Sequence, residues 1–251
     1  GIGKATLAFG FAGDVLTRTG DEPEERVVAQ IRMGSHPNLF VLRAGRRDNG
    51  KFGAEIRVDE ARGVLNELHG TRGRAGHRVC IVDAIDDCNT NAVNALLKII
   101  EEPPADTLFL LISHRPGGLL PTIRSRCVSF ALRPLDDAEV QSVIAAQVEN
   151  TDPALLAQAV RFAAGRPRRA LEFIALGGAD ELNILAGWLG MPAEGAARDS
   201  LKLAEFFGRG QGTAAAGFAR NMVFDWLAHE ARSAAGVGRA GAPDQPRLAS
   251  V

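Results

Sequence analysis

Long apolar runs are absent from this 251-residue sequence. It has few cysteines, and its net charge is close to zero. No stretch approaches the roughly 18 to 20 apolar residues that cross a bilayer, so we expect no membrane span. The three cysteines, Cys80, Cys88 and Cys127, form neither a CxxC pair nor an even-numbered disulfide framework. The five histidines show no metal-ligand spacing. These absences predict a cytoplasmic protein with reduced thiols, no zinc and no other metal site.

The formal net charge of −1 gives the chain no overall attraction to nucleic acid. Basic residues nevertheless gather in 43–47, 72–78, 124–133 and 166–169, which permits contact with phosphates, although most such clusters are solvated faces. A DNA-binding module without a nucleotide role is therefore one hypothesis. The sequence shows no helix-turn-helix, zinc finger or aromatic stacking platform to support it.

Apolar runs alternate with helical patterns as far as residue 133, which predicts an α/β core with a parallel sheet. Three runs are continuously apolar, as expected of strands that are covered on both faces. Helices are expected between them, one with its N-cap at Asp59 and one that begins at Asn89 or Thr90. The expected strands are 38–42, 78–82 and 107–112.

Beyond residue 133 the strand patterns disappear and helical patterns take their place. The chain also begins without methionine and inside a motif, so we expect an N-terminus that is truncated within a phosphate loop. The expected domains are an α/β core over 1–133, a small helical domain over 134–178, a C-terminal helical domain over 179–235 and a disordered tail over 236–251.

The first six residues, GIGKAT, resemble the end of a phosphate-binding loop, G-x-x-x-x-G-K-[ST]. Gly1, Gly3 and Lys4 match a loop whose backbone N–H groups and lysine hold phosphate oxygens. The hydroxyl that binds Mg²⁺ is replaced by Ala5, and Thr6 is displaced by one residue, about 100° around a helix. The motif therefore leaves two alternatives, an ATP-binding loop and a simple helix cap. In either case we expect any Mg²⁺ site to be impaired.

The apolar run that ends in Asp83 resembles a Walker B strand. In hydrolysing proteins of this type a glutamate follows the aspartate and polarises the attacking water, but here Ala84 follows. Asp86 and Asp87 lie too far along the chain to be taken as substitutes, and Asp83 could instead cap the next turn. Because both the metal ligand and the water-activating residue are replaced, we expect little or no ATPase activity.

Two longer segments, NALLKIIEEPP (Asn94–Pro104) and LLPTIRSRC (Leu119–Cys127), carry a more specific signal. Together with IRVD (Ile56–Asp59) upstream and GRPRRAL (Gly165–Leu171) downstream, they resemble the AAA+ clamp-loader family of bacterial replicative polymerases. The altered loop and the missing glutamate are most similar to the delta-prime subunits of DNA polymerase III. The resemblance implies a P-loop NTPase-like AAA+ core, a helical lid and a helical collar that joins a ring.

The resemblance also implies roles for single residues. Arg126 corresponds to an arginine finger that reaches the γ-phosphate of ATP on the adjacent subunit. Ser113 occupies the sensor 1 position and Arg168 the sensor 2 position, beside the nucleotide-binding matches at Gly1, Gly3, Lys4, Thr6 and Asp83. The implied partners are motor ATPase and clamp-opening subunits and, through the assembly, a sliding clamp and primed DNA.

Alternatives stay open at each point. The chain could be an active AAA+ ATPase subunit of the same or a related DNA-remodelling assembly, which would hydrolyse ATP on its own. Arg126 and Arg168 could be solvated surface charges. Glu101 and Glu102 are read as a helix-end contact rather than as an acid/base pair, because adjacent helical residues do not face each other.

Overall fold

The computed structural model describes residues 2–45, 55–70, 74–177, 180–190, 197–209 and 213–234. The chain forms two compact units, one of residues 4–132 and one of residues 133–251 together with 1–3. The expected tail, 236–251, lies outside the described residues. Within the described ranges no helix has the length and apolar character that crossing a membrane requires.

Within the described residues, a sheet of three parallel strands forms the centre of the 4–132 unit, in the order β1-β2-β3. The middle strand pairs on both sides, so that Ile81 lies opposite Val41 and Leu110. Its residues from Val79 to Val82 are fully buried, as expected of a strand that is covered on both faces. The predicted α/β core with a parallel sheet is confirmed. The strands are β1 (Leu39–Arg43), β2 (Arg78–Asp83) and β3 (Thr107–Ile112).

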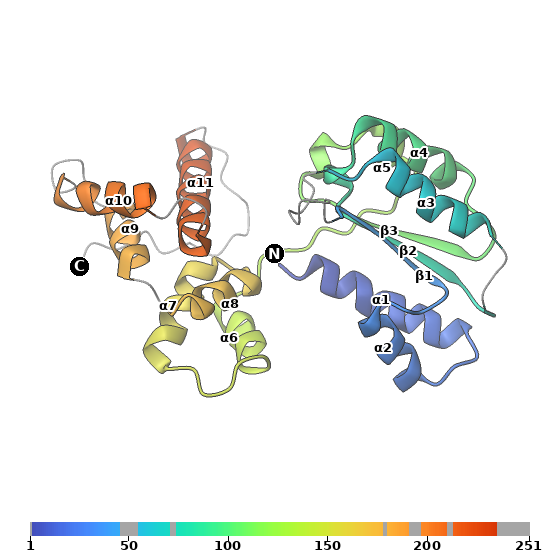
Figure 1. Cartoon of the computed structure of the whole chain (residues 1–251), viewed down its shortest axis with the longest axis horizontal. Helices are drawn as coiled ribbons and strands as arrows, with labels where there is room; N and C mark the ends of the chain where they lie inside the picture. Colours follow the sequence, from blue (N-terminus) through green and yellow to red (C-terminus); the bar gives the residue numbers. More distant parts are fainter. Residues whose placement is uncertain are drawn as a thin grey trace. The chain divides into compact units, whose positions relative to one another are not determined.

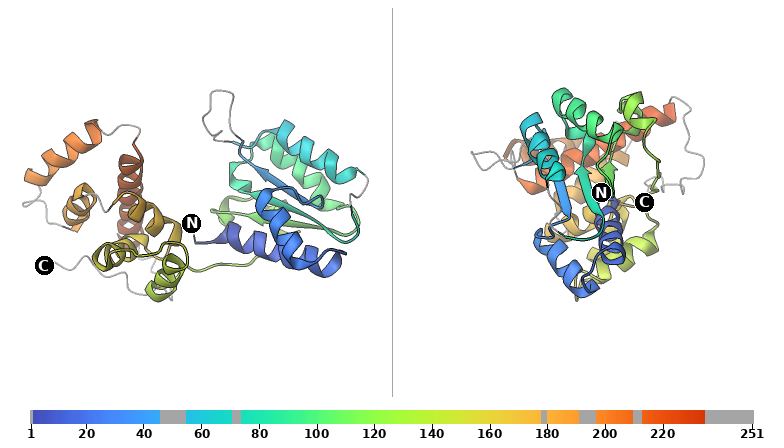
Figure 2. Two further views of the ribbon diagram at one scale, coloured as in Figure 1. Left: turned by 60° about the horizontal axis from the view of Figure 1, so that its bottom comes forward. Right: turned by 90° about the vertical axis from the view of Figure 1, so that its right-hand side faces the viewer.

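Helices cover both faces of this sheet (Figures 1 and 2). Alternate residues of β2 point to opposite faces: Val79 and Ile81 join the hydrophobic cluster of α1 and α2, and Cys80 and Val82 join that of α3, α4 and α5. The strand thus holds two separate helical layers. The helices are α1 (Lys4–Thr19), α2 (Glu24–Met33), α3 (Val58–His69), α4 (Thr90–Glu101) and α5 (Pro121–Arg124), with 3-10 turns η1 (Ile85–Asp87) and η2 (Pro116–Gly118).

Helix starts in this unit follow the capping chemistry of the sequence, with one correction. The Asn89 side chain accepts a hydrogen bond from the Ala92 amide at 2.9 Å, so the predicted start of α4 is confirmed. The prediction of an N-cap at Asp59 is wrong, because α3 already begins at Val58. The Glu60 carboxylate accepts a hydrogen bond of 2.7 Å from the backbone amide of Arg57, the residue that precedes the helix.

A single hydrophobic cluster holds the helices of the other unit together. Phe173 of α8, Leu185 of α9 and Phe218 of α11 all belong to it, and the rings of Phe173 and Phe218 lie 5.9 Å apart. The cluster therefore crosses the boundary that the sequence suggests at residue 178, and that boundary stays a prediction. The helices are α6 (Asp137–Ala145), α7 (Pro153–Ala163), α8 (Pro167–Ala175), α9 (Asp180–Gly190), α10 (Ala197–Arg209) and α11 (Ala214–Ala234).

Two arginines at the start of α8 bind one carboxylate on α11. Arg166 donates to Asp225 Oδ2 at 2.7 Å, and Arg169 donates to the same oxygen. The Arg169 side chain is only 10% exposed, and its guanidinium lies 5.3 Å from the centre of the Phe218 ring. Burial lowers the pKa of Arg169, and Asp225 opposes this shift. Because a buried cation needs a counter-ion, Asp225 couples α8 to α11.

The segment that enters α6 is fixed against the turn before α8. The Leu135 amide donates to the Gly165 carbonyl at 3.0 Å. Gly165 has a φ of +72°, and a Cβ at this position would lie 2.5 Å from the Leu135 carbonyl oxygen. Glycine is therefore required here both for its backbone conformation and for the close approach of the two segments.

We expect Asp225→Asn to lower the free energy of unfolding by about 2 kcal/mol, because the substitution removes the charge that balances Arg169. Urea denaturation of the chain, followed by far-UV circular dichroism, measures this change. The matched control is Glu172→Gln, which removes the partner of the exposed Arg168. It is expected to cost about 0.5 kcal/mol or less, and equal losses in the two variants would contradict the role of Asp225.

Candidate functional site

The carboxyl edge of the sheet brings together three of the predicted site residues. Asp83 ends β2 and lies opposite Ile112, the last residue of β3, which Ser113 follows. Lys4 opens α1, and its Nζ donates to the Ser113 carbonyl at 2.6 Å although 109 positions separate the two residues. The lysine of the phosphate-loop motif and the sensor 1 position therefore meet at the edge where ligands of open parallel sheets bind.

The start of α1 shows where the displaced hydroxyl lies. Gly3 has a φ of +85°, a conformation that favours glycine. Ala5 packs against the cluster between α1 and the sheet, whereas Thr6 is exposed. Consecutive helical residues point about 100° apart, so the Thr6 hydroxyl does not take the place of the missing one. These residues do not fit a magnesium site of the phosphate-loop type. The remaining match, Gly1, lies outside the described residues.

Ala84, the residue after Asp83, is closed to solvent. Ala84 is 1% exposed and forms the N-cap of η1. The N-cap of the turn is therefore Ala84 and not Asp83. The alternative that Asp83 caps the next turn gains no support. A methyl group at this buried position offers no base for water activation.

Asp86 organises the turn that carries Ser113. Its Oδ1 accepts hydrogen bonds from the Ser113 hydroxyl at 3.2 Å and the Arg115 amide at 3.1 Å, and its Oδ2 accepts the His114 amide at 2.6 Å. Burial alone would raise the pKa of Asp86, but the hydrogen bonds from His114, Ser113 and Arg115 lower it below its ordinary value. From the sequence alone, Asp86 is considered only as a substitute for the missing glutamate. Its contact with Ser113, 27 positions away, is not visible in local sequence patterns.

Arg126 follows α5 and is held by groups on two helices. Its Nη1 donates to the Thr122 carbonyl at 3.0 Å and to the Ser125 hydroxyl at 3.4 Å. Its Nη2 lies 3.0 Å from Oε1 of Glu101, the last residue of α4. The two charged side chains are 40% and 44% exposed. Arg126 is therefore an oriented surface group and not a freely solvated one.

The surroundings of Arg126 belong to the layer opposite α1. Ile123 and Cys127, on either side of Arg126 in the sequence, pack into the cluster of α3 and α4. Lys4 opens α1, which lies on the other face of the sheet (Figure 1). The arginine and the lysine are thus carried by different layers of the unit.

Arg168 belongs to the other unit, where it forms an exposed pair with Glu172 at 2.9 Å. Its side chain is 79% exposed, in contrast to the buried Arg169 next to it. The sensor 2 assignment stays a prediction.

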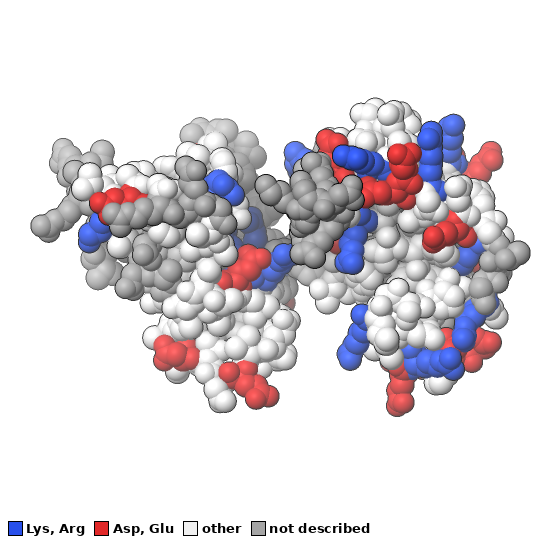
Figure 3. All heavy atoms as spheres, in the orientation of Figure 1, with Lys and Arg blue, Asp and Glu red and all other residues white. Residues whose placement is uncertain are grey.

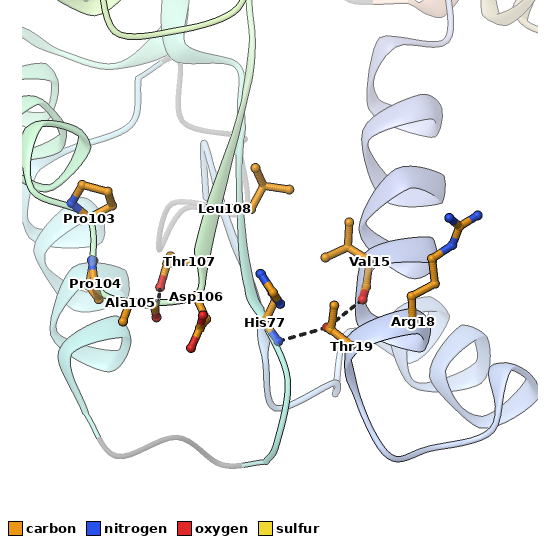
Figure 4. Close-up of a pocket in the computed structure, with 10 residues that line it drawn as sticks. All are labelled: Val15, Arg18, Thr19, His77, Pro103, Pro104, Ala105, Asp106, Thr107 and Leu108. Carbon is orange, nitrogen blue, oxygen red and sulfur yellow. Dashed lines mark hydrogen bonds between the residues drawn. The ribbon is translucent and has the colours of Figure 1, made fainter.

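A groove of about 660 Å³ lies at the other end of the sheet (Figure 4). The His77 amide donates to Thr19 Oγ1 at 3.0 Å, and this hydroxyl donates to the Val15 carbonyl at 2.8 Å along one wall. Thr107, the first residue of β3, lines the groove, which is therefore at the amino end of the strands. Ligands of open α/β sheets bind at the carboxyl end, so this groove is not the candidate site.

Charges of both signs are mixed over the visible face of the 4–132 unit (Figure 3). Several form pairs; Glu22, for example, pairs with both Arg26 and Arg74. A nucleic-acid surface is expected to show a patch or stripe of basic residues. The hypothesis of a separate DNA-binding module gains no support from this face.

Comparison with known proteins gives a consistent result. A family model described as "DNA polymerase III, delta subunit" matches residues 1–136. The delta-prime subunit of DNA polymerase III from Pseudomonas aeruginosa is 36% identical over 175 residues, 68% of this chain and 52% of that protein. The delta-prime subunit from Escherichia coli is 35% identical over 141 residues, 56% of this chain and 40% of that protein.

A subunit of another kind is similar as well. The tau subunit of DNA polymerase III from Salmonella typhimurium is 30% identical over 145 residues, which cover 56% of this chain and 21% of that protein. The matched regions span about half the length or less of these curated relatives.

We expect Asp86→Asn to lower the free energy of unfolding by about 1 kcal/mol at pH 7, because the hydrogen bonds to the Ser113–Arg115 turn lose their charge. The folded-state pKa of Asp86 is depressed, so this contribution is present above the unfolded pKa of about 3.9. It is lost as the pH falls through the lower, folded pKa.

Urea denaturation between pH 7 and pH 3 checks this expectation. The stabilities of the wild type and of Asp86→Asn should converge at the acid end. Asp87→Asn is the matched control and should differ from the wild type by less than Asp86→Asn at pH 7. A constant gap between Asp86→Asn and the wild type across the range would show that the charge of Asp86 is not involved.

Proposed function

Because this chain belongs to the DNA polymerase III, delta subunit family, whose model matches residues 1–136, we propose that it is a delta-prime-like subunit of a bacterial clamp loader. In this role it hydrolyses little or no ATP itself. It presents Arg126 to the ATP of a neighbouring subunit while the assembly places a sliding clamp on primed DNA.

The observation that carries this proposal is the orientation of Arg126. A guanidinium that is fixed by the Thr122 carbonyl and by Glu101, yet 40% exposed, is suited to meet a group outside the chain. It lies in the α3–α4 layer, whereas Lys4 lies in the α1 layer. This separation favours action on a nucleotide held by another subunit over action on one held by Lys4.

The chemistry of such a group is charge stabilisation. During phosphoryl transfer, negative charge spreads over the oxygens of the γ-phosphate and the leaving group, and a planar guanidinium can donate to two of them at once. Arginine fingers supplied by a partner protein accelerate GTP hydrolysis by about 10³- to 10⁵-fold. The neighbouring subunit supplies the nucleotide, its magnesium and the attacking water, and this chain supplies one positive charge.

The same proposal accounts for the weak nucleotide site. Ala5 packs against the cluster between α1 and the sheet, Thr6 is exposed and Ala84 is buried. The chain therefore offers neither the hydroxyl ligand for Mg²⁺ nor the base for the attacking water that a complete site needs. Lys4 and Ser113 can still support weak ATP binding at the carboxyl edge.

The proposed partners are motor ATPase and clamp-opening subunits in the cytoplasm, and through them the sliding clamp and primed DNA. The helices of residues 134–178 would form the lid, and those of 179–235 the collar that joins the ring. On α11, Phe224 is 61% and Leu227 49% exposed. Such exposed apolar side chains suit packing against another subunit.

We expect Arg126→Ala to lower the steady-state ATPase rate of the reconstituted clamp loader, with clamp and primed DNA present, by tenfold or more. The reason is the loss of charge stabilisation at the neighbour's phosphate. Arg124→Ala is the matched control, because it removes an exposed arginine from the same segment. Gel filtration must show intact complexes. Equal rates in Arg126→Ala and the wild type would refute the trans-acting role.

We expect the isolated chain to show no magnesium-dependent ATP hydrolysis above the background of a Lys4→Ala variant. A phosphate-release assay at saturating ATP measures this. Hydrolysis that Lys4→Ala abolishes would instead support the alternative of an active ATPase subunit.

A further inference from the structure

The ion pair between Arg126 and Glu101 joins the two sequence segments that carry the family resemblance. Glu101 lies in NALLKIIEEPP at the end of α4, and Arg126 lies in LLPTIRSRC after α5. In the structure Arg126 Nη2 is 3.0 Å from Glu101 Oε1. We propose that Glu101 is a positioning residue that holds the Arg126 guanidinium in the orientation in which it meets the neighbour's phosphate. This inference rests on the function proposed above.

The first support comes from how α4 fixes Glu101. The helix is capped at its start by Asn89, and it buries Leu96 and Ile99 against the sheet and α3. It ends at Glu101, just before Pro103 and Pro104, which cannot continue a helix with normal hydrogen bonds. The backbone that carries Glu101 is therefore anchored to the core through Leu96 and Ile99, which places the carboxylate within reach of Arg126.

The second support comes from the donors of the guanidinium. An arginine side chain has five N–H donors in a rigid plane. The hydrogen bonds to Thr122 and Ser125 both use Nη1, and the pair with Glu101 is made through Nη2. Contacts at two nitrogens define the plane of the guanidinium. Among the described contacts none uses Nε, so its N–H and the one N–H of Nη2 that is not turned toward Glu101 remain for phosphate oxygens.

The third support comes from the exposure of the pair. Arg126 is 40% and Glu101 44% exposed, and ion pairs at such sites are weak because water screens them. A weak pair cannot lock Arg126 away from a phosphate, whose charge exceeds that of one carboxylate. It can reduce the number of arginine rotamers before the subunits meet, and so lower the entropy that ordering this side chain costs.

The neighbouring carboxylate does not share this role. Glu102 is exposed and follows the last helical residue, with its amide bonded to the Lys98 carbonyl at 3.3 Å. The two glutamates carry the same charge and differ in sequence by one position. Glu102→Gln is therefore a control that changes the net charge of this region by the same amount as Glu101→Gln.

The experiment compares Glu101→Gln, Glu102→Gln and Arg126→Ala in the reconstituted clamp loader with clamp and primed DNA. For Glu101→Gln we expect kcat for ATP to fall about two- to fivefold, the range that a screened surface pair can supply. The KM for ATP should stay unchanged, because the neighbouring subunit binds the nucleotide. Glu102→Gln should keep the wild-type kcat.

A second measurement follows the Arg126 side chain directly. In the isolated, ¹⁵N-labelled chain at low temperature, the guanidinium N–H resonances of Arg126 are identified by their loss in Arg126→Lys. Exchange of the Nη2 protons, which face Glu101, with water should be faster in Glu101→Gln than in the wild type and unchanged in Glu102→Gln. This readout does not depend on ATP, on partner subunits or on the proposed function.

The outcomes separate the two proposals. If Arg126→Ala leaves kcat unchanged, the proposed function is wrong and the inference falls with it. If Arg126→Ala lowers kcat but Glu101→Gln matches Glu102→Gln or is faster than the wild type, the function stands and the positioning role is overturned. A fall in kcat for Glu101→Gln together with faster exchange at Arg126 supports both.

Discussion

Parallel pairing of β2 with a strand on each side is the constraint on which the rest of this molecule depends. It places the ends of all three strands at one edge, where Asp83 and Ser113 lie and where α1 delivers Lys4. It also buries β2 on both faces, so that helices must form two layers. One layer then carries α1 with Lys4, and the other carries the segment of Arg126.

The Arg169–Asp225 and Arg126–Glu101 ion pairs differ in how far water reaches the arginine. Arg169 is 10% exposed and depends on Asp225 for its counter-charge, so this contact acts on stability. Arg126 and Glu101 are both more than a third exposed, so their contact adds little to the free energy of unfolding. We propose that it orients the Arg126 guanidinium instead. The same chemical pair therefore links two helices in one unit, and in the other it supports Arg126 in the role proposed above.

Local patterns were enough to predict the sheet and the start of α4, because apolar runs and an Asn cap act over a few neighbouring residues. The contacts that organise the Ser113 turn and join α8 to α11 were not predictable in this way. Asp86 meets Ser113 across 27 positions, and Arg169 meets Asp225 across 56. The error at Asp59 has a local cause, since Glu60 reaches back to the Arg57 amide and α3 starts earlier than the acidic residue suggests.

The contact between Leu135 and Gly165 has a mechanical consequence for Arg126. Leu135 is anchored in the helical unit, whereas Arg126 is anchored beside α4. The residues between them form neither helix nor strand. A chain spans at most about 3.3 to 3.6 Å per residue, so these anchors can never separate by more than roughly 30 Å. Whatever the arrangement of the two units, the covalent connection therefore limits how far Arg126 can lie from Leu135.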